Sequence, residues 1–125
     1  FTDSLTHIYN RLHFANFLAT QVDKTKRYGG TFSIIFFDLD NFKEVNDNYG
    51  HLAGDHILEQ VTKLVSAANR SADIFARYGG EEFICILPET DESGALALAN
   101  KIRESIENNP YKDYHFYDIL VFVDL

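Results

Sequence analysis

The sequence predicts an α+β fold in which helices pack on a mixed central sheet. Two observations carry this prediction. Long stretches with apolar residues at helical spacing alternate with short runs rich in β-branched and aromatic residues, and the resulting order of elements is α-β-α-α-β-β-α-β. The length of 125 residues and the hydrophobic fraction of 46% suit one soluble domain over residues 1–125.

The first third of the chain predicts a helix followed by a buried strand. After a lead-in over residues 3–10, Asn10 is the expected N-cap of a helix that ends at Gly29 and Gly30. The apolar face expected of this helix consists of Leu12, Ala15, Leu18, Ala19 and Val22. The run 32–37 is apolar without alternation, so we expect a central strand that is buried on both faces.

Two helices are expected after this strand. Residues 41–49 predict a short helix that is closed by Gly50, and a longer helix is expected to begin near Gly54. The inward residues are expected to be Phe42, Val45 and Tyr49 in the short helix and Ile57, Leu58, Val61, Leu64, Val65 and Ala68 in the longer one.

The remaining sequence predicts a hairpin, a helix and a strand. Strands over 73–78 and 82–87 flank Gly79–Gly80, a pair that favours a type I′ turn because this turn needs positive φ at both central positions. A helix is expected over 91–108 and a last strand over 116–125. The inward residues of that helix are expected to be Ala95, Leu98, Ala99, Ile102 and Ile106. From the first strand onward, this order is the ferredoxin-like arrangement.

Charge and cysteine content bear on the class of function. The net charge of −8 disfavours duplex nucleic acid as a partner, although metal ions between carboxylates and phosphates allow a polyanionic small ligand. No apolar stretch reaches membrane-spanning length, so we expect no membrane contact from this fragment, while a longer parent protein can be membrane-anchored. Cys85 is the single cysteine and forms no disulfide framework, which fits a cytoplasmic location.

Four carboxylates are candidates for a metal site. Asp38 and Asp40 lie two residues apart where the buried strand ends, so an extended backbone points both side chains to one face. Glu81 and Glu82 follow the glycine pair, and a hairpin can bring them beside the end of a neighbouring strand. All-oxygen ligand sets suit Mg²⁺ or Mn²⁺. Taken alone, Asp38 and Asp40 are more simply interpreted as solvated acids at a strand end.

Polar residues near the acidic strand end hint at a phosphate and a base. Lys43 can hold a phosphate as a point charge, and the amide of Asn46 with the carboxylate of Asp55 can read the edge of guanine. Each also has a plainer interpretation, as a surface lysine, a helix-end amide and a first-turn acid matched to the helix dipole. Gly79 and Gly80 leave room for a ligand against the backbone, beside their role in the turn.

These residues belong to spaced blocks along the chain. The blocks are Asp3-Ser-Leu-Thr6 with Asn10-Arg11, Phe36-Phe-Asp-Leu-Asp-Asn-Phe-Lys43, Val45-Asn-Asp47, Gly50-His51, Gly54-Asp55 and Arg77-Tyr-Gly-Gly-Glu-Glu-Phe83. Together, from residue 3 to about residue 108, they resemble the signature of the GGDEF family of diguanylate cyclases. The resemblance implies a palm-type nucleotidyl cyclase fold that joins two GTP molecules into cyclic di-GMP and pyrophosphate.

The resemblance also implies a role for each candidate residue. Asp38 and Glu81, with the backbone carbonyl of Leu39, would hold two Mg²⁺ or Mn²⁺ ions per active site. Glu82 would take part in the chemistry with Asp38 and Glu81, and Asp40 would be a supporting carboxylate. The groups implied to bind GTP are Phe42 and Lys43 for the phosphates, Asn46 and Asp55 for guanine, and Gly79 and Gly80 in the turn. Because each domain holds one nucleotide, catalysis would need a homodimer.

Arg70 and Asp73 match a further motif of this family, an Arg-x-x-Asp placed five residues before the glycine pair. The resemblance implies an inhibitory site for cyclic di-GMP, in which the arginine forks onto guanine and the aspartate accepts from its edge. The alternative is a surface ion pair between a helix end and a strand start, which contributes little to stability. We favour the inhibitory site because position and residue type both agree.

After Pro110 the motifs end. The family continues into a strand with a Ser-x-Gly core and a basic last helix, whereas residues 111–125 contain neither Ser nor Gly, so we expect the usual C-terminal strand and helix to be lacking. The sequence leaves open whether residues 118–125 pair beside the first strand. Two functions follow: a product-inhibited diguanylate cyclase that uses two metal ions, or a non-catalytic module that binds GTP or cyclic di-GMP.

Overall fold

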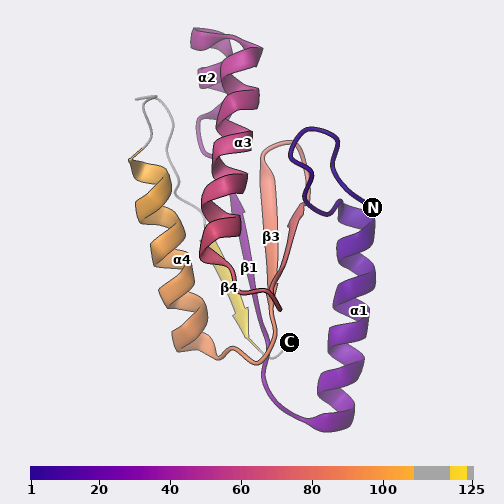
Figure 1. Cartoon of the computed structure of the whole chain (residues 1–125). Helices are drawn as coiled ribbons and strands as arrows, with labels where there is room; N and C mark the ends of the chain where they lie inside the picture. Colours follow the sequence, from indigo (N-terminus) through magenta and orange to yellow (C-terminus); the bar gives the residue numbers. More distant parts are fainter. Residues whose placement is uncertain (109–118, 124–125) are drawn as a thin grey trace.

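The elements of the chain follow the predicted order (Figure 1). The computed structural model describes residues 1–108 and 119–123. Its elements are α1 (Arg11–Tyr28), β1 (Ser33–Asp38), α2 (Phe42–Tyr49), α3 (His51–Ala68), β2 (Ile74–Arg77), β3 (Glu82–Leu87), α4 (Glu92–Glu107) and β4 (Ile119–Val123). The predicted α+β class is therefore confirmed.

The sheet has the strand order β2-β3-β1-β4, which is the order of a ferredoxin-like fold. Each neighbouring pair is antiparallel, so the expectation of a mixed sheet is corrected. The reason is that β1 and β2 run in the same direction but β3 lies between them. The parallel pairing of Tyr9 with Ala76 is an isolated bridge rather than a ladder.

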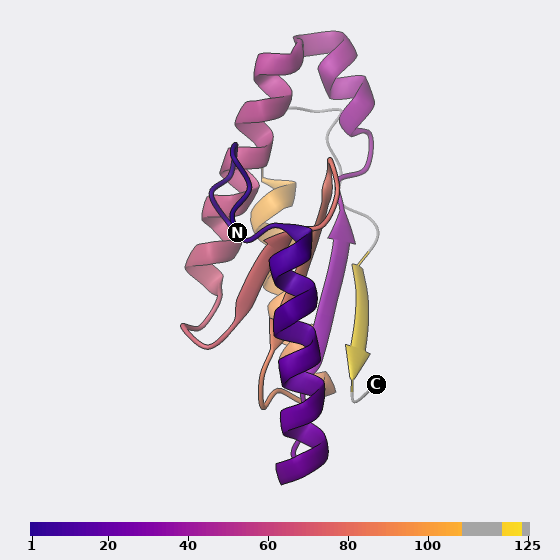
Figure 2. The ribbon, with the colours of Figure 1, turned by 90° about the vertical axis from the view of Figure 1, so that its right-hand side faces the viewer.

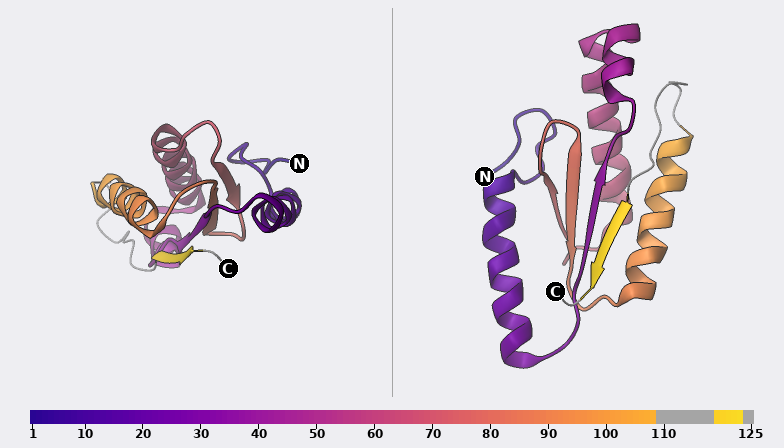
Figure 3. Two further views of the ribbon diagram at one scale, coloured as in Figure 1. Left: turned by 90° about the horizontal axis from the view of Figure 1, so that it is seen from below. Right: turned by 180° about the vertical axis from the view of Figure 1, so that it is seen from behind.

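Helices cover both faces of the sheet, with α1 on one face and α3 and α4 on the other (Figures 2 and 3). Alternate residues of β1 and β3 point to opposite faces, so each strand contributes to two clusters. The strand residues on the α3–α4 side are Ile35, Phe37, Phe83, Cys85 and Leu87. Those on the α1 side are Ile34, Phe36, Ile84 and Ile86. The predicted burial of the first strand on both faces is confirmed.

The first helix begins as predicted but buries only part of the predicted face. The Asn10 side chain accepts a hydrogen bond from the His13 backbone N–H at 2.9 Å, as expected of an N-cap. Leu12 is 72% exposed, whereas Phe14 is buried against the sheet. The predicted positions Ala15 and Ala19 are also exposed. The predicted residues Leu18 and Val22 do pack against the sheet, because they lie on the same helix face as Phe14.

Gly50 separates α2 and α3 and has φ of 91°, a value that favours glycine. It closes α2 as predicted, but α3 begins directly at His51 rather than near Gly54. Val45 is fully buried, as expected for α2. Tyr49 and Leu64, expected to point inward, are 49% and 40% exposed. The α2 end of the helix pair extends past the sheet (Figure 1).

The hairpin between β2 and β3 is wider than predicted. Residues 78–81 separate the two strands, and neither Gly79 nor Gly80 has the positive φ that a type I′ turn requires. Instead, the Tyr78 N–H donates to the Glu82 carbonyl at 2.8 Å. The Arg77 guanidinium donates to the carbonyls of both glycines, so a side chain holds this loop.

The strand β4 pairs antiparallel with β1, with Ser33 opposite Val123. This pairing answers the question that the sequence left open, because the edge of β1 is occupied by a strand of the same chain. The predicted flanks 116–118 and 124–125, together with Pro110, lie outside the described residues. Among the described residues, no helix is long and apolar enough to span a membrane.

Candidate active site

Acidic residues from two strands meet at one end of the sheet. Asp38, the last residue of β1, lies opposite Glu82, the first residue of β3. The Leu39 N–H donates to the Glu81 carbonyl at 3.1 Å, which fixes the backbone of Glu81 beside the end of β1. Opposite residues of an antiparallel pair project to the same face, so Asp38 and Glu82 share a face. The predicted approach of the hairpin glutamates to a neighbouring strand end is confirmed.

Electrostatic repulsion is concentrated on Glu81. Burial, followed by the carboxylates of Asp38, Glu82, Glu44 and Asp40, raises the pKa of Glu81 above its ordinary value. Glu44, in the first turn of α2, was not among the predicted site residues. It could have been found from the sequence, because it is an acidic residue that closely follows the Asp38–Asp40 segment.

The donor chemistry of this edge fits a hard divalent cation. Carboxylates that repel each other are stabilised by a cation between them, and Mg²⁺ and Mn²⁺ prefer oxygen donors. Oδ1 of Asp38 is buried at this edge. In the part of the chain that the structure describes, no three His, Cys, Asp or Glu side chains are arranged to hold a metal ion. The predicted ligands, Asp38, Glu81 and the Leu39 carbonyl, include only two side chains and stay a prediction.

The residues predicted to read guanine lie where α2 packs on α3. Oδ1 of Asn46 is buried and has no hydrogen-bond partner among the described residues. Gly54 permits this approach, because a side chain there would overlap the Asn46 amide and crowd Phe42. Asp55 follows Gly54 and is exposed, as is Lys43 on α2. The packing thus brings Asn46 next to the turn of α3 that carries Asp55.

The lead-in segment holds the hairpin loop through an ion pair that sequence reasoning missed. Nη1 of Arg77 donates to both carboxylate oxygens of Asp3, at 3.2 and 3.1 Å, and Nη2 donates to the Gly80 carbonyl at 2.6 Å. Asp3 also accepts from the N–H and hydroxyl of Thr6. Asp3 and Arg77 each belong to one of the spaced motifs in the sequence. The sequence does not show that the two residues are in contact.

Tyr78, the next residue of the loop, is held by α1. The Arg11 guanidinium lies 4.2 Å from the centre of the Tyr78 ring, a cation–π contact. The same ring makes edge contacts with Phe14 and Phe36. A side chain on Gly79 would collide with the Glu82 carboxylate, so that glycine lets the acid lie against the loop.

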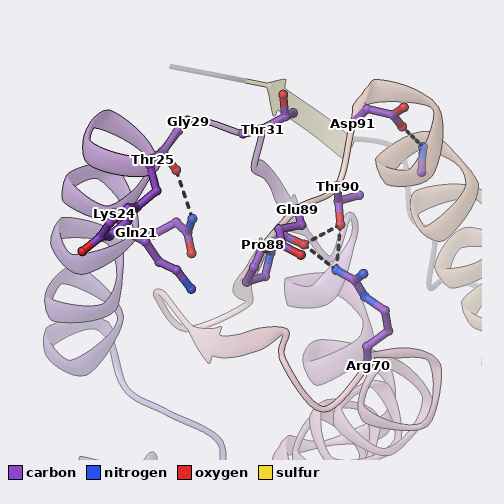
Figure 4. Close-up of a pocket in the computed structure, with 13 residues that line it drawn as sticks. Gln21, Lys24, Thr25, Gly29, Thr31, Arg70, Pro88, Glu89, Thr90 and Asp91 are labelled. Atoms are coloured by element: carbon purple, nitrogen blue, oxygen red, sulfur yellow. Dashed lines mark hydrogen bonds between the residues drawn. The ribbon is translucent and has the colours of Figure 1, made fainter.

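Arg70 and Asp73 form a separate polar cluster at the opposite end of β3. The Arg70 N–H donates to Oδ2 of Asp73 at 2.9 Å, and Nη2 donates to Oδ1 at 2.9 Å. The Asp73 side chain is only 2% exposed and that of Arg70 is 55% exposed. The pair is therefore not the fully solvated surface ion pair of the plainer interpretation. Nη2 also donates to the Pro88 carbonyl and the Thr90 hydroxyl (Figure 4).

Comparison with known proteins places these motifs in one family. The family model described as "Diguanylate cyclase, GGDEF domain" matches residues 1–115, and thus extends beyond Pro110. Diguanylate cyclase A of Treponema denticola is 44% identical over 109 residues, which are 85% of this chain and 29% of that protein. The chain therefore spans less than a third of the length of this curated relative.

Solved structures agree with the fold. The GGDEF domain of YfiN (TpbB) from Pseudomonas aeruginosa superposes with a TM-score of 0.84 at 30% identity, covering 98% of this chain and 73% of that one. The GGDEF domain of DgcB from Caulobacter crescentus, solved in complex with c-di-GMP, superposes with a TM-score of 0.83 at 28% identity, covering 98% and 74%.

Proposed function

The chain belongs to the GGDEF family, and we propose that it is the catalytic domain of a diguanylate cyclase that condenses two GTP molecules into cyclic di-GMP and pyrophosphate. The observation that carries this proposal is the acidic edge. Asp38 faces Glu82 across the β1–β3 ladder, and burial together with the neighbouring carboxylates raises the pKa of Glu81. Such an arrangement suits a cation-dependent reaction of phosphates. Without a cation, the repulsion between the carboxylates would destabilise the site.

In this proposal Asp38, Glu81 and the Leu39 carbonyl hold two Mg²⁺ or Mn²⁺ ions. When bound, these ions would stabilise the negative charge on the attacking 3′-oxygen and on the leaving pyrophosphate, which lowers the activation free energy. Lys43 and the backbone amides at Phe42, in the first turn of α2, bind the terminal phosphates. The helix N-terminus adds its partial positive charge to theirs.

Asn46 and Asp55 are proposed to select guanine. The buried Oδ1 of Asn46 needs a donor, which the amino group of guanine supplies and adenine does not supply at that position. Asp55 can accept from the same edge of the base. We expect GTP to bind much better than ATP, because ATP would leave these groups unsatisfied.

The reaction joins two nucleotides, and each chain offers one acidic edge. Two copies must therefore bring their edges face to face, and catalysis belongs to a homodimer. Arg70 and Asp73 are proposed to bind the product and inhibit the enzyme. Support for binding of this molecule comes from the GGDEF domain of DgcB, which was solved in complex with c-di-GMP.

The direct test is incubation of the purified chain with GTP and Mg²⁺, with chromatographic detection of cyclic di-GMP. Product is expected from the parent sequence and none from Asp38→Asn, whose circular dichroism spectrum should be unchanged. The initial rate should rise more steeply than linearly with protein concentration if two chains are needed. Binding of GTP without any product would favour the non-catalytic module and would refute the enzyme.

A further inference from the structure

Hydrogen-bond acceptors of the same chain surround the Arg70 guanidinium. The two hydrogens of Nη2 are shared among Oδ1 of Asp73, the Pro88 carbonyl and Oγ1 of Thr90, the last two at 2.7 Å. The Thr90 hydroxyl donates its single hydrogen to the Pro88 carbonyl at 3.0 Å. Its lone pairs are therefore left for Arg70, and the hydroxyl acts as an acceptor toward the guanidinium.

The loop that supplies these acceptors is firmly placed. The hydroxyl of Ser33, a fully buried residue of β1, donates to the Thr90 carbonyl at 2.7 Å. Glu89 has φ of 50°, an unusual value for a residue other than glycine, and it turns Pro88 and Thr90 toward Arg70. The acceptors stay in place whether or not Arg70 does, because their backbone is anchored independently.

We propose that Thr90 and the Pro88 carbonyl form a latch that keeps Arg70 in a self-paired state, and that cyclic di-GMP binds only after Arg70 leaves it. This inference rests on the proposed product site at Arg70 and Asp73. A guanine edge and a guanidinium are both planar sets of N–H donors, so the ligand and Arg70 compete for the Asp73 carboxylate. Thr90 thereby sets the affinity for the product without taking part in the cyclase reaction.

Space for this movement adjoins the latch. Arg70 borders a cavity of about 650 Å³ between the end of α1 and the Pro88–Asp91 loop. Figure 4 shows Arg70 reaching toward Pro88 and Thr90, with Gln21 and Lys24 of α1 on the other side of the cavity. A second cavity, of about 430 Å³, lies on the side of Asp73 that faces the lead-in segment. The released guanidinium and a ligand both have room here.

The latch predicts that removing a hydrogen bond strengthens the binding of cyclic di-GMP. If only the unlatched fraction binds, the apparent dissociation constant is the intrinsic one divided by that fraction. Thr90→Val removes the hydroxyl but keeps the size and the backbone anchor, and should tighten cyclic di-GMP binding about three- to tenfold, the range expected for one lost hydrogen bond. Thr90→Ser keeps the hydroxyl and should bind like the parent.

Isothermal titration of cyclic di-GMP into the parent, Thr90→Val and Thr90→Ser chains tests this, with each substitution repeated in an Arg70→Ala background. The gain from Thr90→Val must vanish when Arg70 is absent, since the effect acts through that side chain. GTP binding should be the same in all Thr90 variants. Unchanged or weaker product binding by Thr90→Val would overturn the latch.

A separate readout distinguishes the latch from the product site. If neither the parent nor any variant binds cyclic di-GMP, the proposed product site is wrong, and the Nε–H signal of Arg70 in nitrogen-15 NMR then decides the latch. Faster hydrogen exchange of Nε–H in Thr90→Val than in Thr90→Ser supports the latch, and equal exchange rates refute it.

Discussion

Replacing Asp3 with asparagine should destabilise the fold and loosen the active-site hairpin. Asp3 and Arg77 are both mostly buried, with side chains 20% and 18% exposed, and the guanidinium contacts both carboxylate oxygens. Hydrogen bonds to charged groups contribute about 1.5–3 kcal/mol, and the partial exposure lowers this to about 1–2 kcal/mol. Asp3→Asn keeps an acceptor for Thr6 but removes the charge that holds Arg77.

The effect should depend on pH in a defined direction. Burial acts to raise the pKa of Asp3, but hydrogen bonds from Thr6 and the Arg77 guanidinium outweigh it, so the pKa lies below the ordinary value of 3.8. A depressed pKa in the folded state stabilises the fold above the unfolded value and loses that contribution as the pH falls through the folded value. The stability gap between the parent and Asp3→Asn should be constant from pH 7 to about pH 4 and shrink below it.

Urea unfolding from pH 7 down to pH 2.5 measures this gap. Asp23→Asn is the matched control, because Asp23 also pairs with an arginine, Arg27, but both side chains are 65% or more exposed. That substitution should change the free energy of unfolding by less than about 0.5 kcal/mol. No loss of stability in Asp3→Asn at pH 7, or a gap at pH 2.5 as large as the gap at pH 7, would refute this account of the ion pair.

Three other outcomes follow from the geometry. Asp38→Asn should leave thermal stability equal or higher, because it relieves repulsion on Glu81, while Mg²⁺-dependent GTP binding measured by calorimetry falls at least about tenfold. Gly54→Ala should displace the Asn46 amide and lower the preference for GTP over ATP several-fold in a competition assay, with little change in the urea midpoint. Cyclic di-GMP should lower the maximal rate of the enzyme without raising the GTP concentration that gives half of it; relief of inhibition by excess GTP would contradict this.

The fold was predictable wherever one periodicity dominated. The continuous apolar run of β1 and the single stripe of α4, with Ala95, Ala99, Ile102 and Ile106 buried, led to correct assignments. The inward face of the first helix was only partly predictable, because Leu18 and Val22 pack on the sheet as expected whereas Phe14 is buried in place of Leu12. The two strands of the hairpin were predicted correctly, but its turn type was not, because glycine pairs favour type I′ turns locally while hydrogen bonds from the Arg77 side chain hold a wider loop.

The site was predictable in residue type and only partly in arrangement. Strand-end acids beside hairpin glutamates could be expected from the topology, and the Asp38–Glu82 pairing confirms their juxtaposition. The contacts of Arg77 with Asp3 and of Arg70 with Thr90 could not, since they join residues 74 and 20 positions apart through side chains that no local pattern aligns. Long-range polar contacts of this kind depend on the finished packing.

The geometry of β1 and β3 separates the proposed GTP site from the proposed product site. Glu82 begins β3 and Pro88 follows its last residue, so β3 itself, five steps of about 3.4 Å or about 17 Å, lies between the acidic edge and the latch, and Pro88 is one residue farther on. β1 repeats this separation, because Asp38 ends it while Ser33 begins it and donates to Thr90. A ligand held at Arg70 therefore does not occupy the GTP site of its own chain. In the proposed homodimer, inhibition from Arg70 would act on how two chains bring their acidic edges together, and this is why we expect that added GTP does not compete with it.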